Sequence, residues 1–385
     1  MDLQHRTRAT SSSRLTARRV WWRLHRDLGL SVGLVFVLLG LSGSLLVFYP
    51  RLDLWLNPQL QVAPQPGPEQ SYQQMLETVQ KAYPQCGGSW QLELPLRAED
   101  RAYTARCRRT AAAMSGEFAP QMVTVNPYTL QVLGNRQWGQ TVMSWIYDLH
   151  LTLLLGTTGT LLLGGIGLLL CLSLVSGFYL WWPRQLAFAK ALHFKRGAAA
   201  ARRNYDLHKL AGVCGLAFTL MLTVTGALLA TPQWFKPTID ALSPLARMPM
   251  LHSAPAAGRA MLDADTVAGL ARAAFPDAEL RWLDTPEDAQ GVYSLRLWQR
   301  GEPSRRFPKT FVWLDAYSGA LLATRDARQR SAGDALFAWL HPLHNGEVLG
   351  LAGRWLILLA GVLPLPMYVT GFIRWRQKCR AARGR

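Results

Sequence analysis

Four of the eight histidines in this chain have a residue type and a spacing that suit metal ligation. Each follows a leucine and precedes a Ser-Gly or Thr-Gly pair. The separation is 18 residues for His25 to Gly43 and for His208 to Gly226, and 27 residues for His150 to Gly177 and for His344 to Gly371. Imidazole is the commonest metal ligand in proteins. The repeated spacing therefore indicates two copies of one ligand set.

Smaller residues near these histidines extend the pattern. Gly29 and Gly212 lie four residues after His25 and His208, one turn along a helix face, where a missing side chain leaves room for a bulky planar group. His341 lies three residues before His344, which the repeat spacing favours as the ligand. The roles open to His341 are an alternative ligand, a proton donor, a contact to a cofactor carboxylate and a surface residue.

The elements that position these residues are long apolar helices. Half of the chain is hydrophobic, and four stretches without charged residues are long enough to cross a bilayer: residues 28–48, 149–183, 210–235 and 355–373. We therefore expect an α-helical membrane protein with a four-helix transmembrane bundle.

The distribution of charge predicts the orientation. Residues 1–27, 183–209 and 374–385 hold 20 Lys and Arg but only three acidic residues. The positive-inside rule then places both termini in the cytoplasm, and the basic character reports topology rather than nucleic-acid binding.

The offsets predict a tandem internal duplication of span, external module and span. The expected segments are a basic N-terminus (1–27), TM1 (28–49), module 1 (50–140), TM2 (141–183), a cytoplasmic loop (184–207), TM3 (208–235), module 2 (236–338), TM4 (339–373) and a basic tail (374–385). Residues 75–95 resemble residues 266–286, so each module is expected to be a helix on an antiparallel sheet with a core of its own.

On this topology the four histidines form two pairs. Parallel repeats relate span 1 to span 3 and span 2 to span 4, which places His25 with His208 at the cytoplasmic side and His150 with His344 at the external side. A haem with two axial imidazoles, held between facing helices, suits each pair. If the last helix is continuous, His344 lies about 16 Å outside the uncharged part of span 4.

Other external residues leave alternatives open. Cys86 and Cys107 are the two cysteines outside the spans in the external part, where a disulfide can form, and no C-x-x-C motif supports covalent haem attachment. Arginines and tryptophans of the modules either line a substrate site or belong to sheet edges and core: Arg106, Arg108, Arg109, Arg305, Arg306, Trp90, Trp282 and Trp298.

The paired L-H and [ST]-G motifs, the four spans and the twin motif "VNPYTLQVLG"/"LDAYSGALLA" resemble the PepSY-associated transmembrane family of bacterial inner-membrane proteins. The resemblance implies PepSY-like modules in the periplasm, two haem b groups held by His25, His208, His150 and His344, and a function similar to that of the FoxB-type di-haem ferric-siderophore reductases. Such an oxidoreductase reduces Fe(III) in an imported siderophore, for example of the hydroxamate type, and releases Fe(II).

The electron donor expected from the sequence is a quinol or a separate protein. The chain has no G-x-G-x-x-G motif after a strand, and its cytoplasmic segments are too short to fold a nucleotide-binding domain. The alternative functions are a di-haem reductase for another metal complex or partner protein, and a siderophore permease or sensor without redox chemistry. A permease is disfavoured because the helix centres are almost wholly apolar.

Overall fold

The computed structural model describes residues 2–96, 102–107, 120–183, 187–254 and 258–383, with side chains from residue 17 onward. The chain divides into two compact units. The helical unit comprises Met1–Val47, Leu149–Pro232 and Leu343–Arg385, and the sheet unit comprises Phe48–Asp148 and Gln233–Pro342. Each unit is described by itself.

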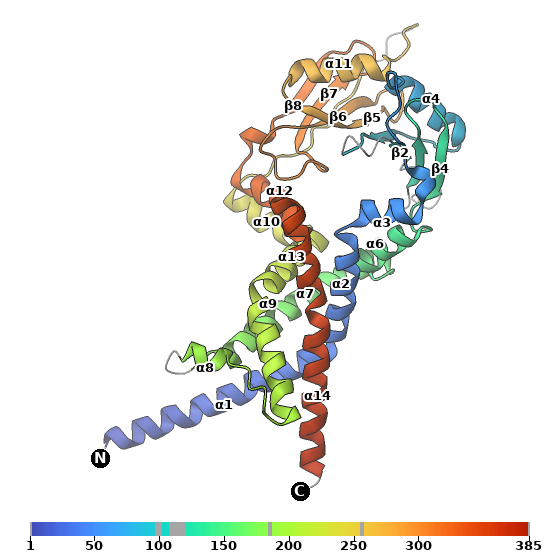
Figure 1. Cartoon of the computed structure of the whole chain (residues 1–385). Helices are drawn as coiled ribbons and strands as arrows, with labels where there is room; N and C mark the ends of the chain where they lie inside the picture. Colours follow the sequence, from blue (N-terminus) through green and yellow to red (C-terminus); the bar gives the residue numbers. More distant parts are fainter. Residues whose placement is uncertain (1, 97–101, 108–119, 184–186, 255–257, 384–385) are drawn as a thin grey trace. The chain divides into compact units, whose positions relative to one another are not determined.

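The helical unit contains the membrane-crossing candidates (Figure 1). Its elements are α1 (Asp2–Ser31), α2 (Gly33–Leu46), α7 (Gly156–Trp181), α8 (Phe188–Leu192), α9 (Ala200–Ala230), η4 (Glu347–Leu349), α13 (Gly350–Val362) and α14 (Pro364–Arg383). Three segments are long and apolar enough to cross a bilayer: Gly156–Trp181, Ala200–Ala230 and Glu347–Arg383. A fourth candidate, Ala17–Ser31 with Gly33–Leu46, is bent by 53°. The chain is therefore a membrane protein with three candidate spans, or four if the bent pair is one span.

Small residues bring these helices into close contact. A Cβ at Gly167 of α7 would lie 2.9 Å from the Cβ of Ala227 on α9, and one at Gly40 of α2 would collide with the backbone of Gly361 on α13. Ser44 beside it donates a hydrogen bond to the Leu358 carbonyl at 2.9 Å. Gly167 thus serves helix packing.

Two of the expected spans are interrupted. Helix α6 (Val142–Thr152) is separated from α7 by residues 153–155, of which Leu153 and Leu154 have left-handed φ angles of 52° and 60°. Helix α12 (Ala332–His344) is likewise separated from α13, and Gly346 there has φ 76°. The expectation that His344 lies about 16 Å out along a continuous helix is wrong, because the helix ends at His344 and the chain turns before α13 begins.

The sheet unit is built on one antiparallel sheet of eight strands, in the order β4-β3-β2-β1-β5-β6-β7-β8. The strands are β1 (Trp90–Glu93), β2 (Tyr103–Cys107), β3 (Gln121–Val125), β4 (Val132–Gln137), β5 (Glu279–Asp284), β6 (Val292–Trp298), β7 (Thr310–Asp315) and β8 (Leu321–Arg325). The helical elements of this unit are α3 (Tyr49–Leu56), η1 (Pro58–Leu60), α4 (Tyr72–Ala82), α10 (Pro232–Leu242), α11 (Ala264–Ala274) and η3 (Ala327–Gln329). The unit also includes α6 as far as Asp148 and α12 as far as Pro342.

The two predicted modules share one core, which corrects the expectation of a separate core for each. Strands β1 and β5 pair antiparallel, with Leu92 opposite Leu283, and so join the two halves of the sheet. The buried cluster beneath α4 and α11 takes Leu92 and Val123 from one half and Leu295 and Val312 from the other (Figure 1). The apolar faces are continuous across the join, so burial favours one sheet over two.

Local signals place the two covering helices. Ser71 and Gln74 form a capping box at the start of α4. The Asp265 carboxylate of α11 accepts hydrogen bonds from the backbone amides of Tyr72 and Gln73 at 2.9 and 3.0 Å, so it caps α4 from the other half of the unit. A disulfide joins Cys86, just after α4, to Cys107 of β2.

Candidate functional site

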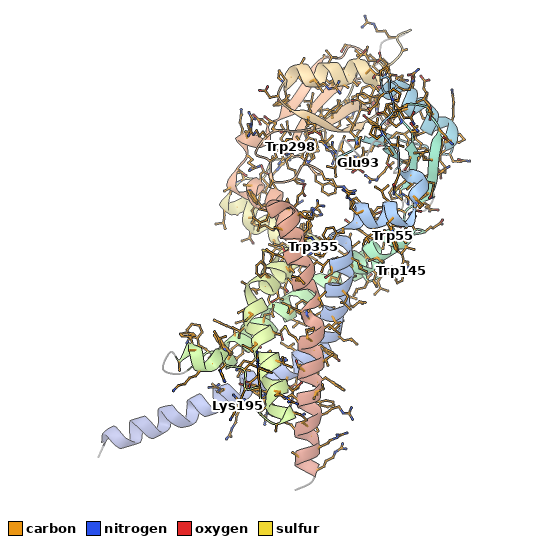
Figure 2. The ribbon with its side chains drawn as sticks, in the orientation of Figure 1. Trp55, Glu93, Trp145, Lys195, Trp298 and Trp355 are labelled. Atoms are coloured by element: carbon orange, nitrogen blue, oxygen red, sulfur yellow. A yellow bond between two sulfur atoms is a disulfide. The ribbon has the colours of Figure 1, made fainter. Side chains whose placement is uncertain are left out.

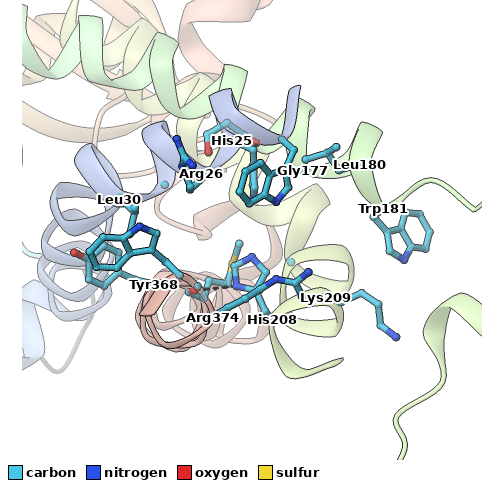
Figure 3. Close-up of a pocket in the computed structure, with 18 of the residues that line it drawn as sticks. His25, Arg26, Leu30, Gly177, Leu180, Trp181, His208, Lys209, Tyr368 and Arg374 are labelled. Atoms are coloured by element: carbon cyan, nitrogen blue, oxygen red, sulfur yellow. Dashed lines mark hydrogen bonds between the residues drawn. The ribbon is translucent and has the colours of Figure 1, made fainter. Parts of the chain in front are cut away.

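The inner pair of histidines comes from two helices that are far apart in the sequence. His25 of α1 and His208 of α9 face one another with ring centroids 6.3 Å apart and ring planes at 72° (Figure 3). Both line a cavity of about 710 Å³ whose walls come from α1, α2, α7, α9 and α14. That volume lies within the usual range of cofactor and ligand pockets.

The outer pair repeats this distance. His150, in the last turn of α6, and His344, the last residue of α12, have ring centroids 6.2 Å apart and ring planes at 51°. The ring opposite His150 is thus that of His344. The ring of His341 packs edge-on against Phe307 of the sheet unit, with centroids 5.0 Å apart.

Both distances match two imidazoles that share one metal ion. A metal–nitrogen bond to histidine is about 2 Å long, and a ring nitrogen lies about 1.2 Å from the ring centroid. Two imidazoles on opposite sides of one metal ion would therefore place their centroids about 6.4 Å apart. Two directly packed aromatic rings also have centroids about 4.5–7 Å apart.

The hydrogen bonds of the rings favour a shared metal ion over direct ring packing. Each Nδ1 lies within hydrogen-bond distance of a Ser or Thr hydroxyl on another helix of the helical unit. The pairs are His25 with Ser176 at 3.1 Å, His208 with Thr370 at 3.1 Å, His150 with Ser42 at 3.0 Å and His344 with Thr225 at 2.9 Å. Inner-pair Nδ1 atoms also lie 3.0 Å from the carbonyls of Ser173 and Met367.

These hydroxyls act as acceptors. Each donates its own proton to a carbonyl of its helix: Ser176 to Ser173, Thr370 to Pro366, Ser42 to Leu38 and Thr225 to Met221, at 2.6–2.8 Å. The ring therefore donates Nδ1–H to the hydroxyl, and Nε2 keeps a lone pair. Metal-ligating histidines almost always donate their other N–H to such an acceptor.

A glycine follows each hydroxyl residue and makes room for the ring. If each glycine carried a Cβ, that atom would lie close to the Cε1 of the histidine ring. The distances are 2.8 Å from Gly43 to His150, 2.8 Å from Gly177 to His25, 3.1 Å from Gly226 to His344 and 3.3 Å from Gly371 to His208. We call each Ser/Thr-Gly pair with its imidazole a clamp. In the sequence these pairs mark only the repeat; their constant spacing from the histidines was the signal, but the contacts appear only in the fold.

The predicted glycines Gly29 and Gly212 line the inner cavity. A Cβ at Gly29 would meet nothing within 4 Å, and one at Gly212 would meet only the Met367 Cε at 3.7 Å. These positions border open space rather than a packed neighbour.

The polar groups that line the inner cavity suit the carboxylates of a haem, and the cavity volume suits its macrocycle. Trp181 lines it, and its indole Nε1 is buried without a hydrogen-bond partner. Six Lys and Arg side chains line it as well: Arg18, Arg19, Arg26, Lys209, Arg374 and Lys378.

Among the described residues no three His, Cys, Asp or Glu side chains group around a possible metal. The histidine pairs thus suit a metal that brings further ligands with it, as haem iron does.

A family model supports the membrane assignment independently. The model of the PepSY-associated TM region matches residues 22–378, which is most of the chain. The chain belongs to this family. None of the curated proteins compared with this PepSY-associated chain matches it.

The sheet unit of this PepSY-associated protein holds a second group of polar side chains on the sheet. Glu93 of β1 forms ion pairs with Arg106 of β2 at 2.5 Å and with Arg306 at 3.2 Å, and only 13 % of the Glu93 side chain is exposed. Figure 2 labels Glu93 among the strands. Burial works to raise the pKa of Glu93, but Arg106 and Arg306 outweigh it and lower the pKa. Trp282 of β5, opposite Glu93, carries the Arg106 guanidinium at 5.1 Å.

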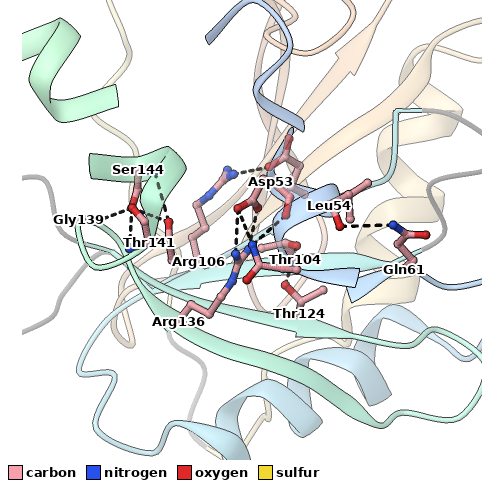
Figure 4. Close-up of polar contacts among 12 residues, drawn as sticks. Asp53, Leu54, Gln61, Thr104, Arg106, Thr124, Arg136, Gly139, Thr141 and Ser144 are labelled. Atoms are coloured by element: carbon pink, nitrogen blue, oxygen red, sulfur yellow. Dashed lines mark hydrogen bonds and ion pairs between the residues drawn. The ribbon is translucent and has the colours of Figure 1, made fainter. Parts of the chain in front are cut away.

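These contacts favour a structural role for the arginines and tryptophans that sequence analysis left open. Arg106 and Arg306 tie the two halves together, and Trp90 and Trp282 are buried. Arg305 pairs with Glu279 and lies over Trp298, whereas Arg108 and Arg109 fall outside the described residues. Asp53 of α3 accepts two hydrogen bonds from Arg136 of β4, each 3.0 Å (Figure 4), which holds α3 to the sheet in the same way.

Proposed function

We propose that this protein is a di-haem b oxidoreductase of the bacterial inner membrane. It carries electrons across the membrane and reduces Fe(III) in an imported siderophore in the periplasm, which releases Fe(II). The observation that carries the proposal is the clamp, found four times, which engages Nδ1 of each histidine in two ring pairs whose centroids are 6.3 and 6.2 Å apart, a separation suited to one metal ion per pair.

The proposal includes a four-span bundle made by tandem duplication, with both termini in the cytoplasm. Three features support it. The first is the equal offsets between histidines and clamps, and the second is the mirrored order of strands about β1 and β5. The third is the matching position of Gly156 and Gly350. These two glycines have φ angles of 56° and 58°, and each lies six residues after an outer histidine.

His25 and His208 would hold one haem, and His150 and His344 the other. When bound, haem supplies reversible one-electron transfer. The chain's own residues fix the orientation of the imidazoles by the clamps, and the tautomer by directing Nδ1–H to a hydroxyl. His208 and Thr225, which mark the two pairs on α9, are 17 residues apart, or about 25 Å along a helix. That distance is most of a hydrocarbon layer about 30 Å thick.

Iron chemistry supports the substrate class. Hydroxamate and catecholate siderophores bind Fe(III) with hard oxygen donors, and the softer Fe(II) is held far more weakly. Transfer of one electron therefore weakens the complex without breaking a covalent bond. No nucleotide-binding motif is needed, because the electron enters from a separate donor.

The test is the absorption spectrum of the purified protein produced with ample haem. We expect a bis-imidazole haem spectrum with two haems per chain, oxidation of the reduced protein by a ferric hydroxamate siderophore, and loss of about half of the haem in both His208→Ala and His150→Ala. A colourless protein would overturn the proposal and favour a permease or a sensor. A haem-loaded protein that ferric siderophores do not oxidise would indicate a reductase for another metal complex or partner.

A further inference from the structure

The cavity of the inner pair continues well past the histidines. Its lining on α14 runs from Pro364 to Ala382, and the clamp glycine of His208, Gly371, lies between them. Eleven residues of helix separate Gly371 from Ala382, which corresponds to about 16 Å. We call the part lined by Arg18, Arg19, Trp22, Lys378, Cys379 and Ala382 the mouth.

The mouth lies beyond the apolar part of α14. The last uncharged stretch ends at Ile373, and the following residues are mostly basic or polar as far as Arg383. Ala382 is nine residues past Ile373, or about 13 Å along the helix axis. A donor that reaches the mouth therefore comes from the aqueous side rather than from the hydrocarbon layer.

Three of the cations that line this cavity lie over aromatic rings, which hold them in place. The Trp22 ring carries the Lys378 Nζ at 4.3 Å and the Arg26 guanidinium at 5.0 Å. The Tyr205 ring carries the Arg374 guanidinium at 4.1 Å. Cations fixed over aromatic faces are preorganised for an anionic partner.

The charge of the cavity is not balanced from within. Asp27 pairs with Arg26 at 2.6 Å, and the buried Asp206 pairs with Lys209 at 3.0 Å. Within the described residues no ion pair joins the other four lining cations, Arg18, Arg19, Arg374 and Lys378, to a carboxylate. The two carboxylates of a haem would neutralise two of these four. At least two positive charges remain for a partner.

We infer that the mouth is the docking surface for an acidic, soluble electron-carrier protein, which is the electron donor of the proposed function. The inference rests on that function. In each encounter the carrier would lose one electron, and a haem iron held by His25 and His208 would gain it. No atom is transferred and no proton has to leave. Opposite charges speed such encounters and make their rate depend on salt.

The test is stopped-flow reduction of the haem-loaded protein in nanodiscs of neutral phosphatidylcholine, with reduced flavodoxin as the acidic carrier and duroquinol as the quinol. We expect reduction by flavodoxin to slow about tenfold when salt rises from about 20 to about 500 mM, because screening weakens the encounter. Arg19→Glu/Lys378→Glu should slow it by about tenfold at low salt and by little at high salt. The matched control is Lys190→Glu on α8, an exposed lysine that does not line the cavity, with an expected change below about twofold.

Each arm has an outcome that overturns the inference. The inference would be wrong if neither salt nor the double variant changed the rate of reduction by flavodoxin. It would also be wrong if duroquinol reduced the protein faster than flavodoxin does, at the same rate in the double variant and in Lys190→Glu. If the double variant loses affinity for phosphatidylglycerol vesicles but accepts flavodoxin electrons at the wild-type rate, the mouth binds lipid instead. An unchanged bis-imidazole spectrum in the double variant shows that the haem site is folded. Absence of that spectrum in the wild type would overturn the proposed function itself.

Discussion

The inner and outer histidine pairs have nearly the same ring separation in different chain contexts. Their ring centroids are 6.3 and 6.2 Å apart, and every ring has its Nδ1 at a Ser or Thr hydroxyl. The inner histidines lie inside α1 and α9, which have 30 and 31 residues, whereas the outer ones lie at the ends of α6 and α12, just before breaks. The geometry is therefore set by the clamp on the neighbouring helix rather than by the helix that carries the histidine.

The breaks after the outer histidines show a second difference. After His344 the left-handed positions are Gly346 and Gly350, whereas after His150 they are Leu153, Leu154 and Gly156. A left-handed conformation costs a non-glycine residue about 1–2 kcal/mol. The two breaks serve equivalent positions, but the one after His150 stores more backbone strain.

The largest expected effect comes from filling the space that a clamp glycine leaves. In Gly177→Ala the new Cβ would lie 2.8 Å from the His25 Cε1, so the imidazole must move and the inner haem should be lost almost completely. Gly371→Ala, with 3.3 Å to the His208 Cε1, should lose less. Haem content of the purified variants, measured by absorption, gives the order.

The control for this series is Gly165→Ala in the same helix as Gly177, because a Cβ at Gly165 would meet nothing within 4 Å. Its haem content should equal that of the wild type. Equal loss in Gly165→Ala and Gly177→Ala would show that α7 tolerates no added methyl group and that the clamp is not the cause.

A smaller effect is expected when the hydroxyl alone is removed. Ser176→Ala leaves His25 with the Ser173 carbonyl at 3.0 Å, so we expect haem affinity at the inner pair to fall by about tenfold, at the low end for such outer-shell changes. Ser176→Thr keeps the hydroxyl and should restore affinity. Haem transfer to apomyoglobin measures the affinity, and an alanine variant as tight as the threonine variant would exclude a role for the hydroxyl.

The same change at the outer pair tests whether the two pairs are equivalent. Thr225→Ala removes the hydroxyl 2.9 Å from the His344 Nδ1, and its effect should fall in the range of about 10–100-fold typical of outer-shell partners. Thr225→Ser is the matching rescue. A loss confined to one of the two pairs would break the comparison made above.

The smallest effects concern the breaks. Gly350→Ala adds a Cβ that meets nothing within 4 Å, so its cost comes from the backbone alone; at φ 58° and ψ −136° that conformation should cost about 1–3 kcal/mol of the free energy of unfolding. Leu154→Gly should stabilise by up to about 1 kcal/mol, because Leu154 has φ 60° and is exposed. Thermal melts in detergent measure both changes, and equal signs for the two variants would contradict the strain argument.

The sequence alone predicted the helical unit better than the sheet unit. Charge-free stretches and the repeat of four histidines predicted candidate spans and paired rings, because both follow from local composition and offsets. The contact between Ser176 and His25 joins residues about 150 positions apart, and nothing in the spacing shows which helices are neighbours. The break at Leu153 and Leu154 falls in a run of leucines with no breaker residue before Gly156.

The union of the two halves of the sheet was beyond prediction for a related reason. Pairing of β1 with β5 depends on two short strands about 190 residues apart whose side chains could equally face separate partners. Glu93, Arg106 and Arg306 are an ordinary mixture of charges in the sequence, and only the fold makes them one buried ion-pair group across the join.

The pairing of β1 with β5 also bears on how such a protein could be divided. A half-length polypeptide that stopped before β5 would leave the β1 edge bare, and an unpaired strand edge is a template for another chain. Two identical halves could then rebuild the sheet as a twofold homodimer, β1 against β1. The covalent linkage of both halves removes that dependence on concentration.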